Sequence, residues 1–188
     1  EHLGRALAVR GKAGIIHAAA PSSMTEAEVL ALAENCRQGG SAQEWQNAIM
    51  LFINFPRDKD ASRRYNNEFV EQDADGCVTM TWFSSPGQTL TSKFIQRLLA
   101  AGQTTNSEQG SIDNTRGGEQ LSDNVSATVS QKQVLLFARY NSGAGYINLG
   151  RLHVHSVKDT TSSVCITWRL ADVGRVMEIF PKFKGFVK

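Results

Sequence analysis

Two histidines on one expected strand are the first residues whose type and spacing could do chemistry. His153 and His155 alternate within GYINLGRLHVHSV (145–157), and alternate residues of a strand share a face. The pair could therefore chelate one metal ion, with Cys165 on the next expected strand as a third ligand. The spacing does not require Cys165 to be a third ligand. Two histidines on a strand more commonly face solvent than bind a metal ion. We expect no metal site and no cofactor.

Motifs for catalysis are absent from the sequence. It contains no glycine-rich phosphate loop, no Gly-x-Ser-x-Gly, no His-Glu-x-x-His and no spaced cysteine–histidine cluster. The acidic residues gather in loops, at 58–60, 68–75 and 108–123, whereas metal-dependent hydrolysis needs two or three carboxylates that converge on one ion. The sequence predicts that the domain is not an enzyme. The hypothesis of a degenerate nuclease would need two loop carboxylates to converge with Lys93 or a histidine in the folded domain.

Residues suited to binding occur in groups at expected strand ends and loops, where sites usually lie. One group is WFSSPGQTLTSK (82–93), in which a strand gives way to small hydroxyls, a Pro-Gly and a lysine. Aromatic rings offer stacking faces, guanidinium groups pair with phosphate or base edges, and hydroxyls form directional hydrogen bonds. Trp82 and Trp168 also share the inward pattern of their strands, which favours the core. We predict these nucleic-acid-binding residues: Arg63, Arg64, Tyr65, Trp82, Phe83, Ser84, Ser85, Gln88, Thr89, Lys93, Arg97, Arg139 and Tyr146.

Charge is spread unevenly along the 188 residues. The net charge is +2, but residues 132–188 hold 9 Lys and Arg against 3 Asp and Glu, and residues 102–131 hold 1 against 4. A basic last third favours a polyanion such as DNA as the partner. The other interpretation is a solvated basic face balanced by an acidic loop.

Composition points to a soluble protein. Hydrophobic residues make up 41% and charged residues 20%, and no apolar run approaches the roughly 18 residues of a membrane span, so we expect no membrane partner. The three cysteines, Cys36, Cys77 and Cys165, lie far apart, which indicates reduced thiols in the cytoplasm or nucleus. The sequence begins with Glu instead of Met, and we expect it to be a piece of a longer protein.

The domain organisation follows from changes in composition along the chain. Residues 1–24 are predicted as a lead-in segment, and residues 25–188 as one α+β domain. Residues 102–131 are rich in Gln, Ser, Asn, Thr and Gly and nearly free of large apolar residues, and they are too many for an ordinary connection. We expect a flexible insertion there.

Local patterns predict the elements of the first half. Ser23 or Thr25 can cap a helix that continues to residue 36. The continuous apolar run 48–55 predicts a buried strand, and the turn signal Asp75-Gly76 precedes an alternating strand that ends at Phe83. Residues 90–100 have helical spacing, and Thr89 or Thr91 can act as the cap.

The end of the chain is predicted to be rich in strands. Residues 133–140, 145–157 and 163–170 form an antiparallel meander, and Gly150 indicates a bulge. A short helix follows within 173–183 and ends at Pro181. Five strands with few helices predict an α+β fold: a curved, partly closed mixed β-sheet, barrel-like and similar to modified-base-reading domains, flanked by two or three helices.

The ordered set of these segments resembles a domain of uncharacterised function found at the C-terminus of bacterial superfamily-two helicases that carry a phospholipase-D-like nuclease. The resemblance covers roughly residues 25–170, with INLG in place of the family's YLG and a longer insertion at 102–131. It implies an accessory module of DNA-processing machinery, often restriction or defence, that reads DNA or a modified base. The matching positions are Tyr65, Phe69, Trp82, Ser84, Ser92, Leu136, Phe137, 147–150 and 167–170.

These observations together predict a non-catalytic DNA-recognition module of a larger DNA-processing protein. Duplex DNA or a flipped base, including a modified one, is the expected ligand, with other domains of the parent protein as further partners. Lys93 and Arg97 are expected to meet phosphate, and Trp82, Phe83 or Tyr146 to stack on a flipped base. The alternative is a protein–protein interaction or structural module of a multidomain enzyme, marked by an exposed apolar strip.

Overall fold

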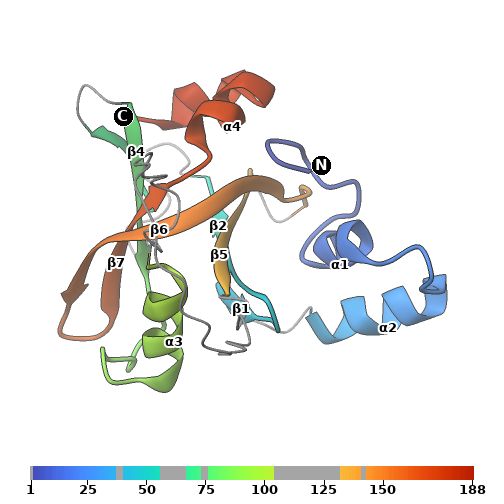
Figure 1. Cartoon of the computed structure of the whole chain (residues 1–188), viewed down its shortest axis with the longest axis horizontal. Coiled ribbons are helices and arrows are strands. Elements are labelled where there is room, and N and C mark those ends of the chain that lie inside the picture. Colours follow the sequence, from blue (N-terminus) through green and yellow to red (C-terminus); the bar gives the residue numbers. More distant parts are fainter. Residues whose placement is uncertain (1, 37–39, 56–66, 73–75, 104–131, 141–142) are drawn as a thin grey trace, which may run out of the picture.

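The computed structural model describes residues 2–36, 40–55, 67–72, 76–103, 132–140 and 143–188. It has the α+β architecture expected from the sequence, with helices packed around one mixed sheet (Figure 1). The strands are β1 (Ala42–Glu44), β2 (Ala48–Asn54), β3 (Phe69–Gln72), β4 (Cys77–Phe83), β5 (Gln133–Arg139), β6 (Ile147–Asp159) and β7 (Val164–Leu170). The helices are α1 (Ala13–Ala19), α2 (Glu26–Cys36), α3 (Lys93–Ala101), α4 (Val173–Ile179) and the 3-10 helix η2 (Pro181–Phe186).

The sheet contains seven strands in the described part of the chain, two more than expected. The order is β1-β2-β5-β6-β7-β4-β3, and β2 and β5 form the parallel pair. The predicted antiparallel meander is confirmed as β5, β6 and β7. The extra strands are the short edges β1 and β3, and β1 and β3 do not pair, so the sheet is open. Segments of three and four residues are too short to show a sequence period.

Strand β2 is buried on both faces, as its unbroken apolar run predicts. Ile49, Leu51 and Ile53 face the main core, which also contains Trp168. Its other face, including Phe52, packs in a second cluster with Leu7 and Ile15, which come from the predicted lead-in. Residues before 25 therefore cover one side of β2 and β5 through α1.

Helix α2 begins at the predicted capping residue. The backbone N–H of Thr25 donates to Glu28 Oε2 at 2.8 Å, and the N–H of Glu28 donates back to Thr25 Oγ1 at 3.3 Å. The hydrogen bond from the Thr25 N–H, and then that from the Thr25 hydroxyl, to the Glu28 carboxylate lower the pKa of Glu28. Thr25 and Glu28 thus form a capping box.

The start of α3 differs from the prediction. Neither Thr89 nor Thr91 is the cap: Ser92 occupies the N-cap position, and it makes no side-chain cap bond. Its hydroxyl instead accepts the backbone N–H of Thr89 at 2.9 Å and so closes the turn before the helix. Ile95 and Leu98 are buried on the inner face, as helical spacing predicts.

The bulge expected at Gly150 is confirmed. Gly150 has φ +88°, and the pairing of β5 with β6 shifts register opposite Leu136 and Phe137. A second register shift lies in β6 between Val154 and Ser156. After β7, α4 ends at Ile179, just before Pro181, which begins η2. No helix among the described residues is long and apolar enough to span a bilayer.

Candidate nucleic-acid interface

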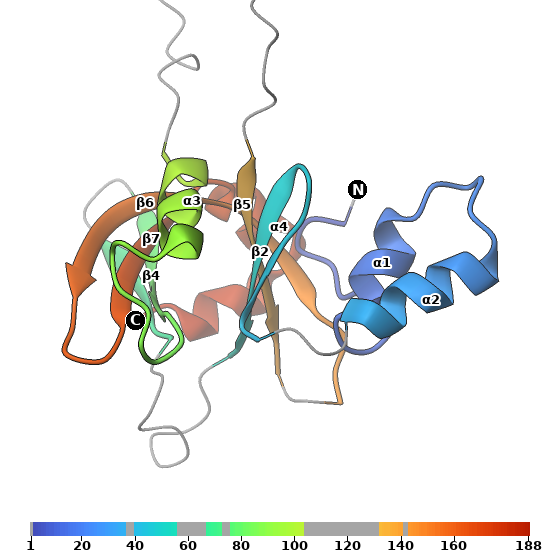
Figure 2. The same ribbon diagram turned by 90° about the horizontal axis from the view of Figure 1, so that it is seen from below.

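Two turns that are distant in sequence lie side by side at one end of the sheet. They are the β4–α3 turn, residues 84–92, and the β6–β7 turn, residues 160–163 (Figures 1 and 2). Ser84 N–H donates to Val164 O and Val164 N–H donates to Ser84 Oγ, each at 2.9 Å, and Gly87 N–H donates to Ser162 O at 2.9 Å. The first turn is therefore fixed to the second by direct hydrogen bonds.

A small pocket and a larger cleft lie at the β4–α3 turn. The pocket has a volume of about 150 Å³ and is lined by aromatic residues with an amide and hydroxyls, among them Phe52, Asn67, Trp82, Phe83, Ser84 and Ser85. The cleft has a volume of about 490 Å³ and is lined by Phe83, Ser84, Pro86 and the hydroxyl-bearing residues 160–163. Phe83, Ser84 and Pro86 line both, so the two hollows adjoin at these residues.

Trp82, one of the residues that line the pocket, has a buried polar atom without a partner in the described part of the chain. Its side chain is 2% exposed and belongs to the main core, yet its indole Nε1 has no hydrogen-bond partner among the described residues. A buried donor without an acceptor costs about 1–3 kcal/mol. Because so little of Trp82 is exposed, its ring does not offer a stacking face. Phe83, which is half-buried, is the aromatic residue available for stacking.

The structure places several of the predicted residues together. Trp82, Phe83, Ser84 and Ser85 line the pocket. Gln88 and Thr89 continue the same turn, and the exposed Lys93 is the first residue of α3. The predicted residues Arg63, Arg64 and Tyr65 lie outside the described residues.

Arg139 and Tyr146 lie apart from this turn, on the α1-covered face of the sheet. Tyr146 is 4% exposed and packs edge-on against Phe52 at 5.1 Å. The Arg139 guanidinium lies 4.8 Å from the centre of the Tyr146 ring, and its Nε donates to Asn54 Oδ1 at 3.0 Å. Burial raises the pKa of Tyr146, while the charge of Arg139 opposes that rise. A buried ring under a guanidinium is not available to stack on a base.

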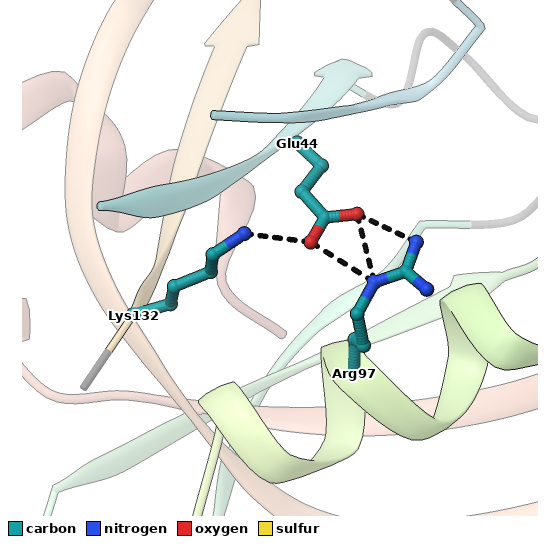
Figure 3. A network of polar contacts seen from close by, with 3 residues as sticks. All are labelled: Glu44, Arg97 and Lys132. Atoms are coloured by element: carbon teal, nitrogen blue, oxygen red, sulfur yellow. Dashed lines mark hydrogen bonds and ion pairs between the residues drawn. The ribbon is translucent and has the colours of Figure 1, made fainter. Parts of the chain in front are cut away.

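Arg97 is engaged by a carboxylate instead of facing an open anion site. Its Nε and Nη2 donate to Glu44 of β1, with the shortest contact at 2.8 Å, and Lys132 Nζ contacts the same carboxylate at 2.7 Å (Figure 3). The hydrogen bonds from Arg97 and then from Lys132 lower the pKa of Glu44 to about 2. The network joins β1, α3 and the residue before β5.

Lysines supply positive charge near the cleft. Lys93 and Lys158 are both exposed, and Lys158 is in register with Cys165, which in turn pairs with Phe83. Burial raises the pKa of Cys165, and the charge of Lys158 acts against that shift. Lys158 and the run Thr160–Ser163 are absent from the predicted residues. The run of hydroxyls TTSS is the sequence signal that could have indicated them.

The two strand histidines do not converge with Cys165. His153 is in register with Arg169, Cys165 is in register with Lys158, and His155 falls at the register shift of β6. A bulge breaks the strict alternation that would put His153 and His155 on one face. The described residues contain no group of three metal-ligating side chains.

No protein-family model matches the sequence, and neither a curated protein nor a solved structure matches it.

Proposed function

We propose that the domain is a non-catalytic DNA-recognition module that reads a base, including a modified one, flipped into the pocket beside Trp82 and Phe83. The observation that supports this most is the composition of the pocket, which combines aromatic walls with the side chains of Asn67 and Ser85. A flipped base is read by hydrogen bonds to its edge and by stacking on aromatic side chains. The residues that line the pocket can make both kinds of contact.

The size of the pocket favours a single small ring. Its volume of about 150 Å³ lies below the roughly 300–1,000 Å³ of sites for drug-sized ligands. The adjoining cleft is wider and lined by the hydroxyls of residues 160–163. Hydroxyls and lysines bind phosphate and sugar oxygens, so the cleft suits the backbone on either side of the flipped nucleotide. Lys93 and Lys158 would supply the electrostatic part of the affinity.

The curvature of the sheet also supports the proposal. Phe55, which follows the interior strand β2, lies with its ring centre 6.1 Å from that of Phe69 in the edge strand β3. This contact across the core supports the proposal of a curved, partly closed sheet, barrel-like and similar to domains that read modified bases. With the resemblance to helicase-associated domains, this favours a place within a larger DNA-processing protein in the cytoplasm or nucleus.

Fluorescence anisotropy tests the proposal with three labelled probes at two salt concentrations. The probes are an unmodified duplex, the same duplex with one 5-methylcytosine or 5-hydroxymethylcytosine, and a single strand. We expect preference for one duplex and a steep loss of affinity with salt. The double variant Lys93→Ala/Lys158→Ala should weaken binding to every probe and flatten the salt dependence.

A matched control variant removes two positive charges at a distance from the candidate site. The variant Arg175→Ala/Lys182→Ala changes two exposed cations of α4 and η2, and α4 lies away from the β6–β7 turn (Figure 1). It should leave affinity nearly unchanged. Equal losses in the two double variants would show diffuse attraction instead of a site. No binding of any probe at low salt would overturn the proposal and favour the alternative, a protein-interaction or structural module.

A further inference from the structure

The second half of β6 forms an open sheet edge in the described part of the chain. Strand β5 pairs with β6 only over residues 147–152, and the N–H of Val154 donates to Gly102 O at 2.8 Å just beyond that pairing. Residues 156–159 pair with β7, and residues 155–159 are all exposed. Both views show the ends of β6 and β7 as a hairpin that projects beyond β5 (Figures 1 and 2). An edge of this kind can pair with another strand.

The hairpin turn determines which backbone groups face the open edge. The N–H of Thr160 donates to Ser163 O at 2.9 Å, so the backbone of Thr160 faces β7. The backbone groups of successive residues alternate between the two sides of a strand. The N–H and C=O groups of Val157 and Asp159 therefore face away from β7, where the sheet has no further strand among the described residues. These groups are available to a strand from outside.

The side chains HSVKD (155–159) complement a second copy of themselves in one antiparallel register. When the pairing is centred on Val157, Asp159 of one copy lies opposite His155 of the other, and Ser156 lies opposite Lys158. An imidazole N–H can donate to a carboxylate. A register centred on Lys158 would instead set two lysines directly opposite each other, which is unfavourable. The charges of this edge therefore favour a second copy of the chain, paired about Val157.

We propose that the domain forms a two-fold dimer in which residues 155–159 of two copies pair antiparallel about Val157. The two valines exchange two backbone hydrogen bonds at the axis. Val157 is in register with the buried Ile166 but is itself 37% exposed, so its contact with the second copy also buries apolar surface. Such an interface is isologous, because each copy contributes the same surface. The inference is independent of DNA binding, since self-association is measured without nucleic acid.

Sedimentation equilibrium of the protein tests the dimer directly. The short pairing buries well below the roughly 1,200 Å² of stable interfaces, so we expect a dissociation constant of roughly 10–500 µM. Over protein concentrations from roughly 10 µM to 1 mM, the average mass should therefore rise from that of one chain toward that of two. The mass of a single chain over the whole range would overturn the proposal. So would a mass that passes beyond two chains, because a two-fold pairing closes at the dimer.

A matched pair of lysine variants locates the interface. Val157→Lys sets two positive charges against each other at the axis and should raise the dissociation constant roughly ten-fold or more. Ile179→Lys makes the same kind of change at the end of α4, where Ile179 is 40% exposed, and should leave the constant within roughly two-fold. Neither residue belongs to a core cluster, so both variants should fold. Equal effects of the two variants would overturn the proposal.

An exchange of residues between the two ends of the pairing tests its register. His155→Asp places a carboxylate opposite Asp159 of the second copy, on both sides of the axis, and should raise the dissociation constant roughly three- to ten-fold. The double variant His155→Asp/Asp159→His restores a histidine opposite each carboxylate, and its constant should return to within roughly two-fold of wild type. A double variant that associates no better than His155→Asp would overturn the proposed pairing about Val157.

Discussion

Ser84 and Val164 exchange two hydrogen bonds at the base of the candidate site. The backbone N–H of Ser84 donates to Val164 O, and the N–H of Val164 donates to Ser84 Oγ, both at 2.9 Å. The two residues are 1% and 0% exposed. Ser84 Oγ also donates to Ser85 O at 3.2 Å. The hydroxyl of Ser84 therefore positions the turn, and a ligand in the pocket meets Ser85 and Phe83 more directly.

Replacing Ser84 by alanine should destabilise the fold. The variant Ser84→Ala leaves the buried N–H of Val164 without its acceptor, which costs about 1–3 kcal/mol of the free energy of unfolding. Urea denaturation followed by circular dichroism measures this loss. The control Ser85→Ala changes the exposed neighbour and should stay within about 0.5 kcal/mol of wild type. Equal losses in the two variants would contradict the role assigned to Ser84.

The indole N–H of Trp82 should matter for base binding. Trp82→Phe removes the buried donor of a residue that lines the pocket. On the proposal that a flipped base accepts from this donor, the affinity for the preferred DNA probe should fall about three- to ten-fold, the value of one hydrogen bond. Trp168→Phe is the matched control, because its indole N–H is also buried without a partner among the described residues but does not line the pocket. Anisotropy titrations in which both variants lose affinity equally would assign the effect to the core.

The ion-pair network of Glu44 should make stability depend on pH in the acid range. The folded pKa of Glu44 is about 2, below its ordinary value of 4.5. The stabilisation is therefore complete above pH 4.5 and is lost as the pH falls toward 2. Because Arg97 is 50% exposed, solvent screens the pair, and Glu44→Gln should cost on the order of 1 kcal/mol at pH 7.

Thermal unfolding at several pH values checks this prediction. The difference in melting temperature between wild type and Glu44→Gln should shrink as the pH is lowered and vanish near pH 2. Glu178→Gln is the control, since Glu178 is exposed and forms no ion pair with the described residues. A difference that stays constant with pH would show that the carboxylate charge of Glu44 does not stabilise the fold.

The bulge at Gly150 should not tolerate a side chain. A Cβ there would lie 2.6 Å from Asp172 Oδ2 and 2.8 Å from its Cβ, and φ is +88°. Asp172 cannot move easily, because it accepts hydrogen bonds from the backbone and side chain of Arg151. Gly150→Ala should therefore lower stability by about 1–3 kcal/mol. Gly174→Ala, in α4 with open space around it, should instead raise stability by about 0.4–1 kcal/mol. Calorimetry of both variants measures the contrast.

Local patterns in the sequence predict most of the elements for identifiable reasons. The unbroken apolar run of β2 reflects burial on both faces, and the alternation in β4 reflects burial of Val78, Met80 and Trp82. The prediction of the α3 cap was wrong because three hydroxyl residues within 89–92 could each take the N-cap position. Tertiary contacts decide which of them does. The edge strand β1 has three residues and depends on pairing with β2, which no local period reveals.

The candidate site was predicted only in the part that lies along one stretch of chain. WFSSPGQTLTSK supplies the pocket residues 82–85, but the opposing turn at 160–163 reaches them because β4 pairs with β7. Pairing between strands about eighty residues apart is set by the whole sheet and not by local pattern. The ion pair between Arg97 and Glu44, which are fifty-three residues apart, cannot be predicted from local sequence for the same reason.

The contacts of Glu44 have a consequence for engineering this chain. Arg97 lies in α3, which ends at Ala101, and Lys132 directly precedes β5, and one carboxylate holds them both. The points at which the backbone departs from α3 and rejoins the sheet are thus anchored to the same edge strand. The entropy of closing a loop grows only slowly with its length. We therefore expect the sheet to stay intact when an affinity tag or a fluorescent protein is inserted after Gln103 and before Lys132, beyond the buried Leu98 and Gly102, and when new termini of a circularly permuted chain are placed there.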